Sequence, residues 1–244
     1  MILEVLENKG LDCERFARTK MLIGEEALGR ILGAHVAVFG LGGVGGAALE
    51  ALARAGVGKL TLVDFDTVSE SNINRQIIAD VDTVGMLKTD AATQRVKKIN
   101  PDAEIIAYNI FYNEENAASV DLSGVDYIVD AIDSVRSKVS LILRAKSENI
   151  PIISCMGTGK RISALGFKIT DIYKTSGCPL ARAMRHELRK SGVQSLKVLC
   201  SDDEVYSLPG SEDQRTPASI SYVPPVAGYI LASEVIKHIA GLEK

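Results

Sequence analysis

The 244-residue chain has little of what marks membrane proteins or basic nucleic-acid coat proteins. No apolar run is long enough to span a bilayer, and the opening MILEVLENKG carries acids where a signal region carries basic residues. The net charge of −3 excludes a globally basic coat but leaves room for a local basic patch. The four cysteines are scattered with no C-x-x-C pair, so no zinc site of that type is expected. A cytoplasmic protein with no membrane partner is the default expectation.

The chain also lacks internal repeats, low-complexity tracts and linker-like stretches, and it reads as strands alternating with helices. Such alternation predicts an α/β fold with a Rossmann-like, mostly parallel sheet flanked by helices and right-handed crossovers. An N-terminal helical arm precedes the first strand. We expect strands over 35–39, 59–63, 103–108, 127–131 and 150–154, and helices ending near Ala55 and covering 86–99, 135–149 and 179–190.

A glycine-rich turn follows the first expected strand, in the run VAVFGLGGVGG from Val36 to Gly46. Glycine lets the backbone approach a phosphate closely, and the helix that opens there presents free N–H groups and its positive end to an anion. The turn is not a Walker loop, because no G-x-x-x-x-G-K-[ST] occurs. Many nucleotide-binding proteins share this spacing, so alone it predicts only a nucleotide site, formed here by Gly40, Gly42, Gly43 and Gly45.

An acid and a polar cluster follow the second expected strand. Asp64 comes directly after the apolar run that ends at Val63, where an acid accepts hydrogen bonds from ribose hydroxyls. The amide and cationic side chains that follow suit a polyphosphate better than a nicotinamide ring, because Arg and Lys neutralise charge on departing phosphate oxygens. A polar surface loop is the alternative interpretation. The predicted nucleotide-binding side chains are Asp64, Asp66, Asn72, Arg75, Gln76 and Lys88.

Four motifs in this order resemble the E1-like adenylating superfamily: GLGGVGG, DFDTVSESNINRQ, the lysine of VGMLK, and VDAIDS. The resemblance covers Arg15 to about Ile153. It implies an enzyme that binds ATP with Mg²⁺, attacks the α-phosphate with a substrate carboxylate and releases pyrophosphate. The sulfur-carrier activators of this superfamily commonly hold a structural zinc through two C-x-x-C pairs, which this chain lacks.

Carried over residue by residue, the resemblance assigns roles to these motifs. Asp133 corresponds to the acid that organises Mg²⁺ and the reacting centre, and Asp130 is the alternative. The family also sends an arginine from an N-terminal helix into the partner subunit's ATP site, which Arg18 fits best and Arg15 second. A homodimer is therefore expected. The implied catalytic residues are Arg18, Arg75, Lys88 and Asp133, with Asp64 on the ribose and Asn72 beside the phosphates.

A basic segment dominates the C-terminal third. Between Lys174 and Lys197 the net charge is +5, with Glu187 as the single acid. In the helix expected from Pro179, the spacing places apolar residues at 180, 184 and 188 on one face and basic residues on the other. Residue chemistry alone leaves two interpretations open, a phosphate-backbone footprint and a solvated helix face. The candidate tRNA-binding residues are Lys174, Arg182, Arg185, Arg189 and Lys190.

Three C-terminal segments resemble one branch of the superfamily, the tRNA threonylcarbamoyladenosine dehydratases: GTGKR, TDIYKTSGCPLARAMRHELRK and SYVPPVAGYILASEVI. This branch adenylates the carboxylate of threonylcarbamoyl-adenosine next to the anticodon. The neighbouring carbamoyl group then closes a ring and expels AMP. The resemblance implies a single adenylating domain over 1–244, with the arm at 1–33, an ATP-binding core at 34–155 and a tRNA-facing part at 156–244.

Two other functions fit parts of the sequence. Activation of a ubiquitin-like sulfur-carrier protein would use ATP at its C-terminus, with a cysteine desulfurase or sulfur-acceptor protein as a partner. Cys178 is the candidate reactive thiol for that relay, because it precedes a helix and lies near Lys174 and Arg182, which lower a thiol's pKa. A nicotinamide dehydrogenase is allowed by the glycine spacing and Asp64, but it leaves the cationic and acidic motifs that follow unexplained.

Overall fold

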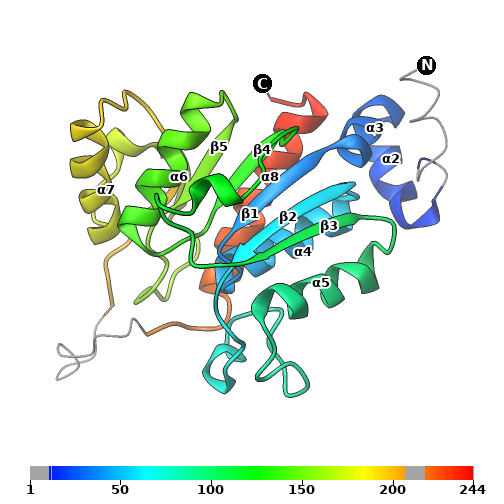
Figure 1. The fold of residues 1–244 in the computed structure, drawn as a ribbon, viewed down its shortest axis with the longest axis horizontal. Coiled ribbons are helices and arrows are strands. Elements are labelled where there is room, and N and C mark those ends of the chain that lie inside the picture. Colours follow the sequence, from blue (N-terminus) through cyan, green and yellow to red (C-terminus); the bar gives the residue numbers. More distant parts are fainter. Residues whose placement is uncertain (1–10, 12, 207–217, 244) are drawn as a thin grey trace.

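A single seven-stranded sheet organises the chain (Figure 1). The computed structural model describes residue 11 and residues 13–206 and 218–243. The strand order is β3-β2-β1-β4-β5-β7-β6, and every neighbouring pair is parallel except β6 and β7. The strands are β1 (His35–Phe39), β2 (Lys59–Asp64), β3 (Glu104–Asn109), β4 (Tyr127–Asp130), β5 (Ile152–Cys155), β6 (Phe167–Asp171) and β7 (Lys197–Ser201).

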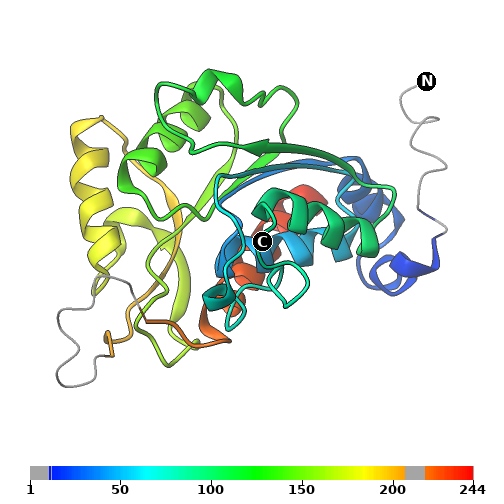
Figure 2. The same cartoon turned by 60° about the horizontal axis from the view of Figure 1, so that its bottom comes forward.

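Helices cover both faces of the sheet, which makes three layers (Figures 1 and 2). One face packs against α3, α4, α5 and α8, and the other against α6 and α7. The helices are α2 (Ala17–Ile23), α3 (Glu25–Gly33), α4 (Gly43–Ala55), α5 (Lys88–Ile99), α6 (Val135–Ser147), α7 (Pro179–Lys190) and α8 (Val223–Ala240), with 3-10 turns η1 (Glu14–Phe16), η2 (Glu70–Asn72), η3 (Ala117–Ser119) and η4 (Ile172–Lys174).

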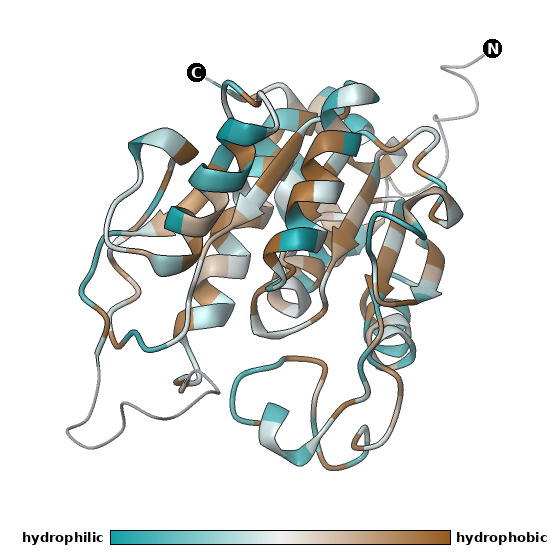
Figure 3. Ribbon diagram, turned by 60° about the vertical axis from the view of Figure 1, so that its left-hand side comes forward, coloured by the Kyte–Doolittle hydropathy of each residue, from teal (hydrophilic) through white to brown (hydrophobic). Residues whose placement is uncertain are grey.

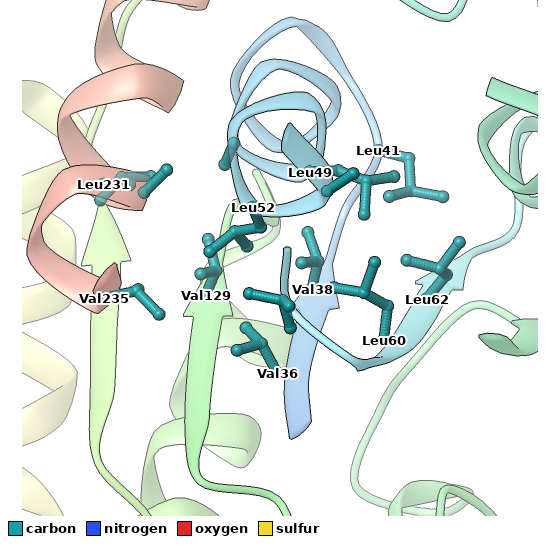
Figure 4. Close-up of a cluster of buried hydrophobic side chains, with 14 of the residues drawn as sticks. Val36, Val38, Leu41, Leu49, Leu52, Leu60, Leu62, Val129, Leu231 and Val235 are labelled. Atoms are coloured by element: carbon teal, nitrogen blue, oxygen red, sulfur yellow. The ribbon is translucent and has the colours of Figure 1, made fainter. Parts of the chain in front are cut away.

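The central strands are apolar along their whole length because they are covered on both sides. Every residue of β1 is buried, and Val36 lies opposite Leu60 of β2 and Tyr127 of β4. Figure 4 shows the core on one face, where Leu52 of α4 and Leu231 of α8 point toward the strands. Figure 3 shows largely apolar strands inside, and helices and loops of mixed hydropathy around them. Among the described residues, no helix is both long and apolar enough to cross a membrane.

The predicted strands and helices are confirmed with shifts of a few residues at their ends. The strand at 35–39 and the helix at 179–190 have the predicted bounds. β6 and β7 were not among the predicted strands. β6, FKITD, is a partly exposed edge strand with polar residues at three of its five positions, and β7, KVLCS, has only three consecutive apolar residues, so neither stands out from a loop by its pattern. Because β7 pairs with β5, one sheet continues across residue 155.

Candidate functional site

A pocket of about 320 Å³ opens at the carboxyl ends of β1, β2 and β4. From β1 the chain continues to β2 on one side and returns to β4 on the other, and doubly wound sheets bind ligands at such a switch point. The walls come from the glycine turn, the polar loop after β2, the segment after β3 and the loop after β4. Three residues from later in the chain, Thr158, Ser219 and Pro224, close the pocket.

The glycine turn has no room for a side chain at Gly40 or at Gly45. Gly40 has a φ of +83°, and a Cβ there would lie 2.7 Å from the carbonyl oxygen of Ala131. A Cβ on Gly45 would lie 1.7 Å from the carbonyl oxygen of Gly40. The bare backbone therefore approaches the pocket at the start of α4, where helix N–H groups favour an anion. Gly40, Gly42 and Gly43 line the pocket, whereas Gly45 lies behind the turn and shapes it.

Asp64 ends β2 with its carboxylate buried beside this turn. One oxygen accepts a hydrogen bond from the N–H of Leu41 at 2.6 Å, and the other accepts from the N–H of Asp66 at 2.9 Å. The carboxylate thus ties the glycine turn to the loop after β2. An ionised carboxylate has about four acceptor positions. Asp64 lines the pocket and can still accept hydrogen bonds from ribose hydroxyls.

Lys88 begins α5 and lies only 5% exposed at the pocket wall. Its Nζ is 2.6 Å from Oδ2 of Asp66, and its backbone N–H donates to the carbonyl oxygen of Asp66. Two predicted nucleotide-binding residues therefore hold each other. A phosphate group entering the pocket would share this ammonium with Asp66, because Lys is a compact cation with three donors.

The loop from Ser69 to Gln76 brings amide and guanidinium groups to the pocket wall. Nη1 of Arg75 donates to the carbonyl oxygen of Ser71 at 2.9 Å and to the side chain of Asn74 at 2.8 Å. Gln76 is buried, and its Oε1 accepts no hydrogen bond from the part of the chain that the structure describes. A buried acceptor without a donor is costly, so a ligand that donates to Gln76 would be favoured here. Asn72 lines the same wall.

The two acids at the end of β4 and in the loop that follows it have different environments. Asp133 is exposed and lines the pocket, whereas Asp130 is fully buried behind it and does not line it. Mg²⁺ is usually held by one or two carboxylates together with water and substrate phosphates, so the single Asp133 carboxylate fits that ion. Groups of three or more His, Cys, Asp or Glu that could hold a metal are absent from the described residues.

The arginines of the N-terminal arm lie far from this pocket within one chain. Arg18 is exposed on α2, and Arg15 is paired with Asp102. Phe16, beside them, packs near Gly56, which follows the end of α4 at the amino ends of the strands. α2 and α7 lie at opposite ends of the long axis (Figures 1 and 2).

Helix α7 buries one apolar face and exposes basic residues on the other. Ala181, Met184 and Leu188 are buried, while Leu180 is only partly covered. The prediction of a buried face at 180, 184 and 188 is therefore right for the last two positions, whereas Ala181 rather than Leu180 is buried at the first. Proline occupies the first turn, where its missing N–H costs no hydrogen bond.

The five candidate tRNA-binding residues differ in how firmly they are held. In the described part of the chain, Lys174 and Arg182 are exposed and form no ion pair. Arg185 is partly buried and bonded to Thr175. Arg189 lies over the ring of Tyr173 at 5.2 Å, and Lys190 pairs with Glu187 at 3.1 Å. All five belong to α7 or to the 3-10 turn η4 before it, and α7 lies at one end of the molecule (Figure 1).

Cys178 precedes α7 and is 3% exposed, so it does not offer an open thiol. A hydrogen bond from the thiol of Cys200, and others from backbone N–H groups including that of Ala181, hold the pKa of Cys178 well below its usual range. The lowered pKa was predicted, but its cause was not. Lys174 and Arg182 are not among the main causes. Cys155 is buried in the core, as its apolar run indicates, and burial raises its pKa to about 12.

An aromatic pair at the pocket rim was not predicted. Phe65 and Phe111 are each about half exposed and contact edge to face, with ring centroids 4.9 Å apart. Both line the pocket. Phe65 lies inside the motif DFDTV and could have been found there. Phe111 follows β3 with no motif around it, so only the fold brings it to Phe65.

Comparisons with known proteins find a family and several similar proteins. A model of the ThiF family matches residues 16–244. The tRNA threonylcarbamoyladenosine dehydratase of Bacillus subtilis is 38% identical over 236 residues, covering 91% of this chain and 93% of that protein. The Escherichia coli protein of the same name is 41% identical over 176 residues, covering 72% of this chain and 66% of that protein. The E. coli enzyme solved with AMP has a TM-score of 0.87 at 32% identity, covering 94% and 95% of the two chains, and the complex with ATP has 0.86 at 34% with the same coverage.

Proposed function

The chain belongs to the ThiF family, and from that premise we propose that it is an ATP-dependent tRNA threonylcarbamoyladenosine dehydratase. The substrate carboxylate attacks the α-phosphate of ATP and pyrophosphate leaves. The neighbouring carbamoyl group then attacks the activated carbonyl carbon, and AMP leaves with one former carboxylate oxygen. Because the ring closes within one molecule, this step benefits from high effective molarity. The net change in the nucleoside is the loss of one water.

The observation that supports this proposal is the meeting of four groups in one pocket. The bare glycine turn, the Asp64 carboxylate, the Lys88 ammonium and the Asp133 carboxylate all line it. Asp64 holds the ribose, and Lys88 with Arg75 and Asn72 binds the phosphates. Positive groups fixed where phosphate charge develops stabilise the transition state. The E. coli tRNA threonylcarbamoyladenosine dehydratase was solved with AMP and with ATP, which supports a nucleotide as the ligand here.

Magnesium belongs to the same proposal. ATP is used as its Mg²⁺ complex, and the ion would neutralise charge on the phosphate oxygens. Asp133 is the residue that holds it, because this carboxylate is exposed at the pocket and has no ion pair in the described part of the chain. Asp130 is committed to a buried ion pair and is not available.

The polynucleotide is bound by α7 and the turn before it. Lys174, Arg182 and Arg189 are exposed there on a chain whose total charge is negative. Lys190 and Arg185 add positive charge, although each is held by a neighbour. Such a one-signed patch fits phosphate contacts, whose contribution falls as salt rises.

A homodimer in the cytoplasm completes the proposal. Arg18 is exposed on α2, and no residue of the described part of the N-terminal arm lines the pocket, so a second subunit is the route by which it could serve as a catalytic residue. Carrier-protein activation with a cysteine desulfurase partner and Cys178 as relay is the weaker alternative, because that thiol is buried.

The test is direct. Protein, ATP, Mg²⁺ and tRNA carrying threonylcarbamoyl-adenosine are incubated, the tRNA is digested mildly, and its nucleosides are weighed. Loss of one water, matched by AMP formation, is the expected result. An unchanged nucleoside from a protein that still exchanges pyrophosphate into ATP would overturn the proposal in favour of carrier activation.

A further inference from the structure

We propose that the buried ion pair between Lys138 and Asp130 positions Asp133 for its work in the nucleotide pocket. This inference rests on the proposed function, which uses Asp133. Both members of the pair have 0% exposed side chains, and the Nζ to Oδ2 distance is 3.0 Å. Neither residue lines the pocket. They act through the loop between them.

Both carboxylate oxygens of Asp130 accept hydrogen bonds. Its Oδ1 accepts from the backbone N–H of Ile132 at 3.2 Å, inside the loop that leads to Asp133. Its Oδ2 accepts from the hydroxyl of Ser154, on β5, at 2.6 Å. The carboxylate thus fixes the first part of the loop to two strands of the sheet.

Lys138 fixes the other end of the same loop. It lies in the first turn of α6, and its backbone N–H donates to the carbonyl oxygen of Ser134. Its ammonium reaches back to the carboxylate of Asp130 and lies 3.5 Å from that residue's carbonyl oxygen. The loop from Ala131 to Ser134 is therefore closed at both ends on one carboxylate, with Asp133 between them.

Stability alone is a poor reason for this pair. Removing two charges from water is costly, and a well-packed apolar pair of similar volume is often as stable or more so. What an apolar pair cannot supply is a directed bond to Ile132 and a fixed entry into α6. A residue that organises a reacting centre must be held to about 0.5 Å, and a shift of about 1 Å can cost about 10²-fold in rate.

The decisive variant removes both charges while keeping the volumes. In Asp130→Asn/Lys138→Met, no lone buried charge remains, so we expect a folded protein with a higher Tm than Lys138→Met alone. Its ATP affinity by calorimetry should match the parent, because the glycine turn, Asp64 and Lys88 are untouched. Its kcat should fall by about 10- to 100-fold with KM for ATP unchanged. The matched control is Lys146→Met, an exposed lysine of the same helix, with parental kcat expected.

A double-mutant cycle separates positioning from a general structural role. If the pair acts through Asp133, adding Asp130→Asn/Lys138→Met to Asp133→Asn should cause no further loss of kcat. Asparagine at position 130 can still accept from the Ile132 N–H, but a neutral amide oxygen accepts more weakly than a carboxylate, and without Lys138 the loop is no longer closed at its other end. Hydrogen exchange at the Ile132 amide should therefore be faster in the Asp130→Asn/Lys138→Met variant than in the parent. Ser154→Ala, which keeps both charges, should show a smaller kcat loss that also vanishes in the Asp133→Asn background.

The inference is overturned if the kcat of the double variant is parental, or if its loss is equally large with and without Asp133. Should the double variant not fold, the Ser154→Ala cycle decides by the same rule. Failure of the proposed function is seen separately, in the parent, as absence of AMP and of water loss from the nucleoside. The amide exchange measurement needs neither tRNA nor turnover, so it tests the loop in either case.

Discussion

The nucleotide pocket and the basic face of α7 carry charge in opposite ways. In the pocket, Lys88 is buried and already paired with Asp66, and Asp64 is already bonded to the glycine turn. On α7, Arg182 and Arg189 are exposed, and the Arg189 guanidinium lies over the ring of Tyr173. The groups of the pocket are already bonded to one another, whereas these two cations of the helix are exposed, and within the described residues Arg189 is held only by its contact with the Tyr173 ring.

This difference determines how each region should respond to substitution. A fixed site fails when one atom no longer fits, since its backbone and buried ions have no alternative arrangement. An exposed cationic surface loses affinity in steps, one phosphate contact at a time, and salt has the same effect. Substitutions in the pocket should therefore cause the largest losses of ATP binding and turnover, and substitutions on α7 should cause losses of tRNA affinity that depend on salt.

The largest effect is expected for Gly45→Ala. The new Cβ would lie 1.7 Å from the carbonyl oxygen of Gly40, so the turn itself must move. ATP binding measured by calorimetry should be lost, while tRNA binding by α7 should survive if the protein stays folded, as circular dichroism will show. Gly29→Ala is the control, because its Cβ meets nothing within 4 Å and lies inside α3, where alanine adds about 0.5–1 kcal/mol of stability. ATP binding that survives Gly45→Ala would show that the turn is not fixed.

Lys88→Met should have the next largest effect. The fold should persist, because the remaining Asp66 side chain is 44% exposed and can be hydrated. The rate of AMP formation should fall by about 10²–10³-fold, the range seen when one preorganised charge partner is removed. Quenched-flow measurement of pyrophosphate release would check it. A loss confined to KM for ATP would mean that Lys88 stabilises the bound ground state and the transition state equally.

Reversing two charges on α7 should weaken tRNA binding and leave ATP binding intact. For Arg182→Glu/Arg189→Glu, the slope of log affinity against log salt should fall by about two, because each lost phosphate contact removes about one. Filter binding at several salt concentrations measures this slope.

The control for this pair makes the same change in net charge elsewhere. Lys98→Glu/Lys146→Glu reverses two exposed lysines on α5 and α6 that form no ion pair in the described part of the chain. Equal losses from both double variants would mean that tRNA senses total charge, and that α7 is only a solvated face.

The same contrast explains what could be predicted from the sequence. The glycine turn and Asp64 were found because backbone sterics and ribose chemistry force particular residues into particular spacings. The strands of the central sheet were found because a strand buried on both faces must be apolar throughout.

What depended on contacts between distant residues could not be predicted. Nothing in the spacing indicates that Lys88 pairs with Asp66, or that Lys138 closes on Asp130. The partners of Arg185 and Arg189 also come from the preceding turn, so the uniform basic face expected of α7 divides into held and free residues. The roles of individual residues in catalysis and in tRNA binding stay predictions.

Cys178 lies where the two regions meet, and its replacement should have the smallest effect. A Cβ on Gly157 would lie 3.3 Å from its sulfur, and the next residue, Thr158, lines the pocket. The proposed reaction needs no covalent protein intermediate, so Cys178→Ser should leave AMP formation and water loss unchanged. Serine is also a favourable residue before a helix. Abolished turnover would instead support a thiol relay.

The pH dependence of the free energy of unfolding tests whether the same thiol is ionised in the folded protein. The pKa of Cys178 in the folded protein lies below its unfolded value near 8.5, so the unfolded chain binds more protons between those two values. The stability that this thiolate contributes is therefore present above about pH 8.5 and is lost as the pH falls through the folded pKa. Urea unfolding at pH 6, 7 and 8 should show that the free energy of unfolding of the parent rises relative to that of Cys178→Ser as the pH rises. If the difference in free energy of unfolding between the two proteins does not change with pH, the hydrogen bonds from Cys200 and the helix backbone do not stabilise a thiolate. Cys178 would then be a neutral thiol in the folded protein.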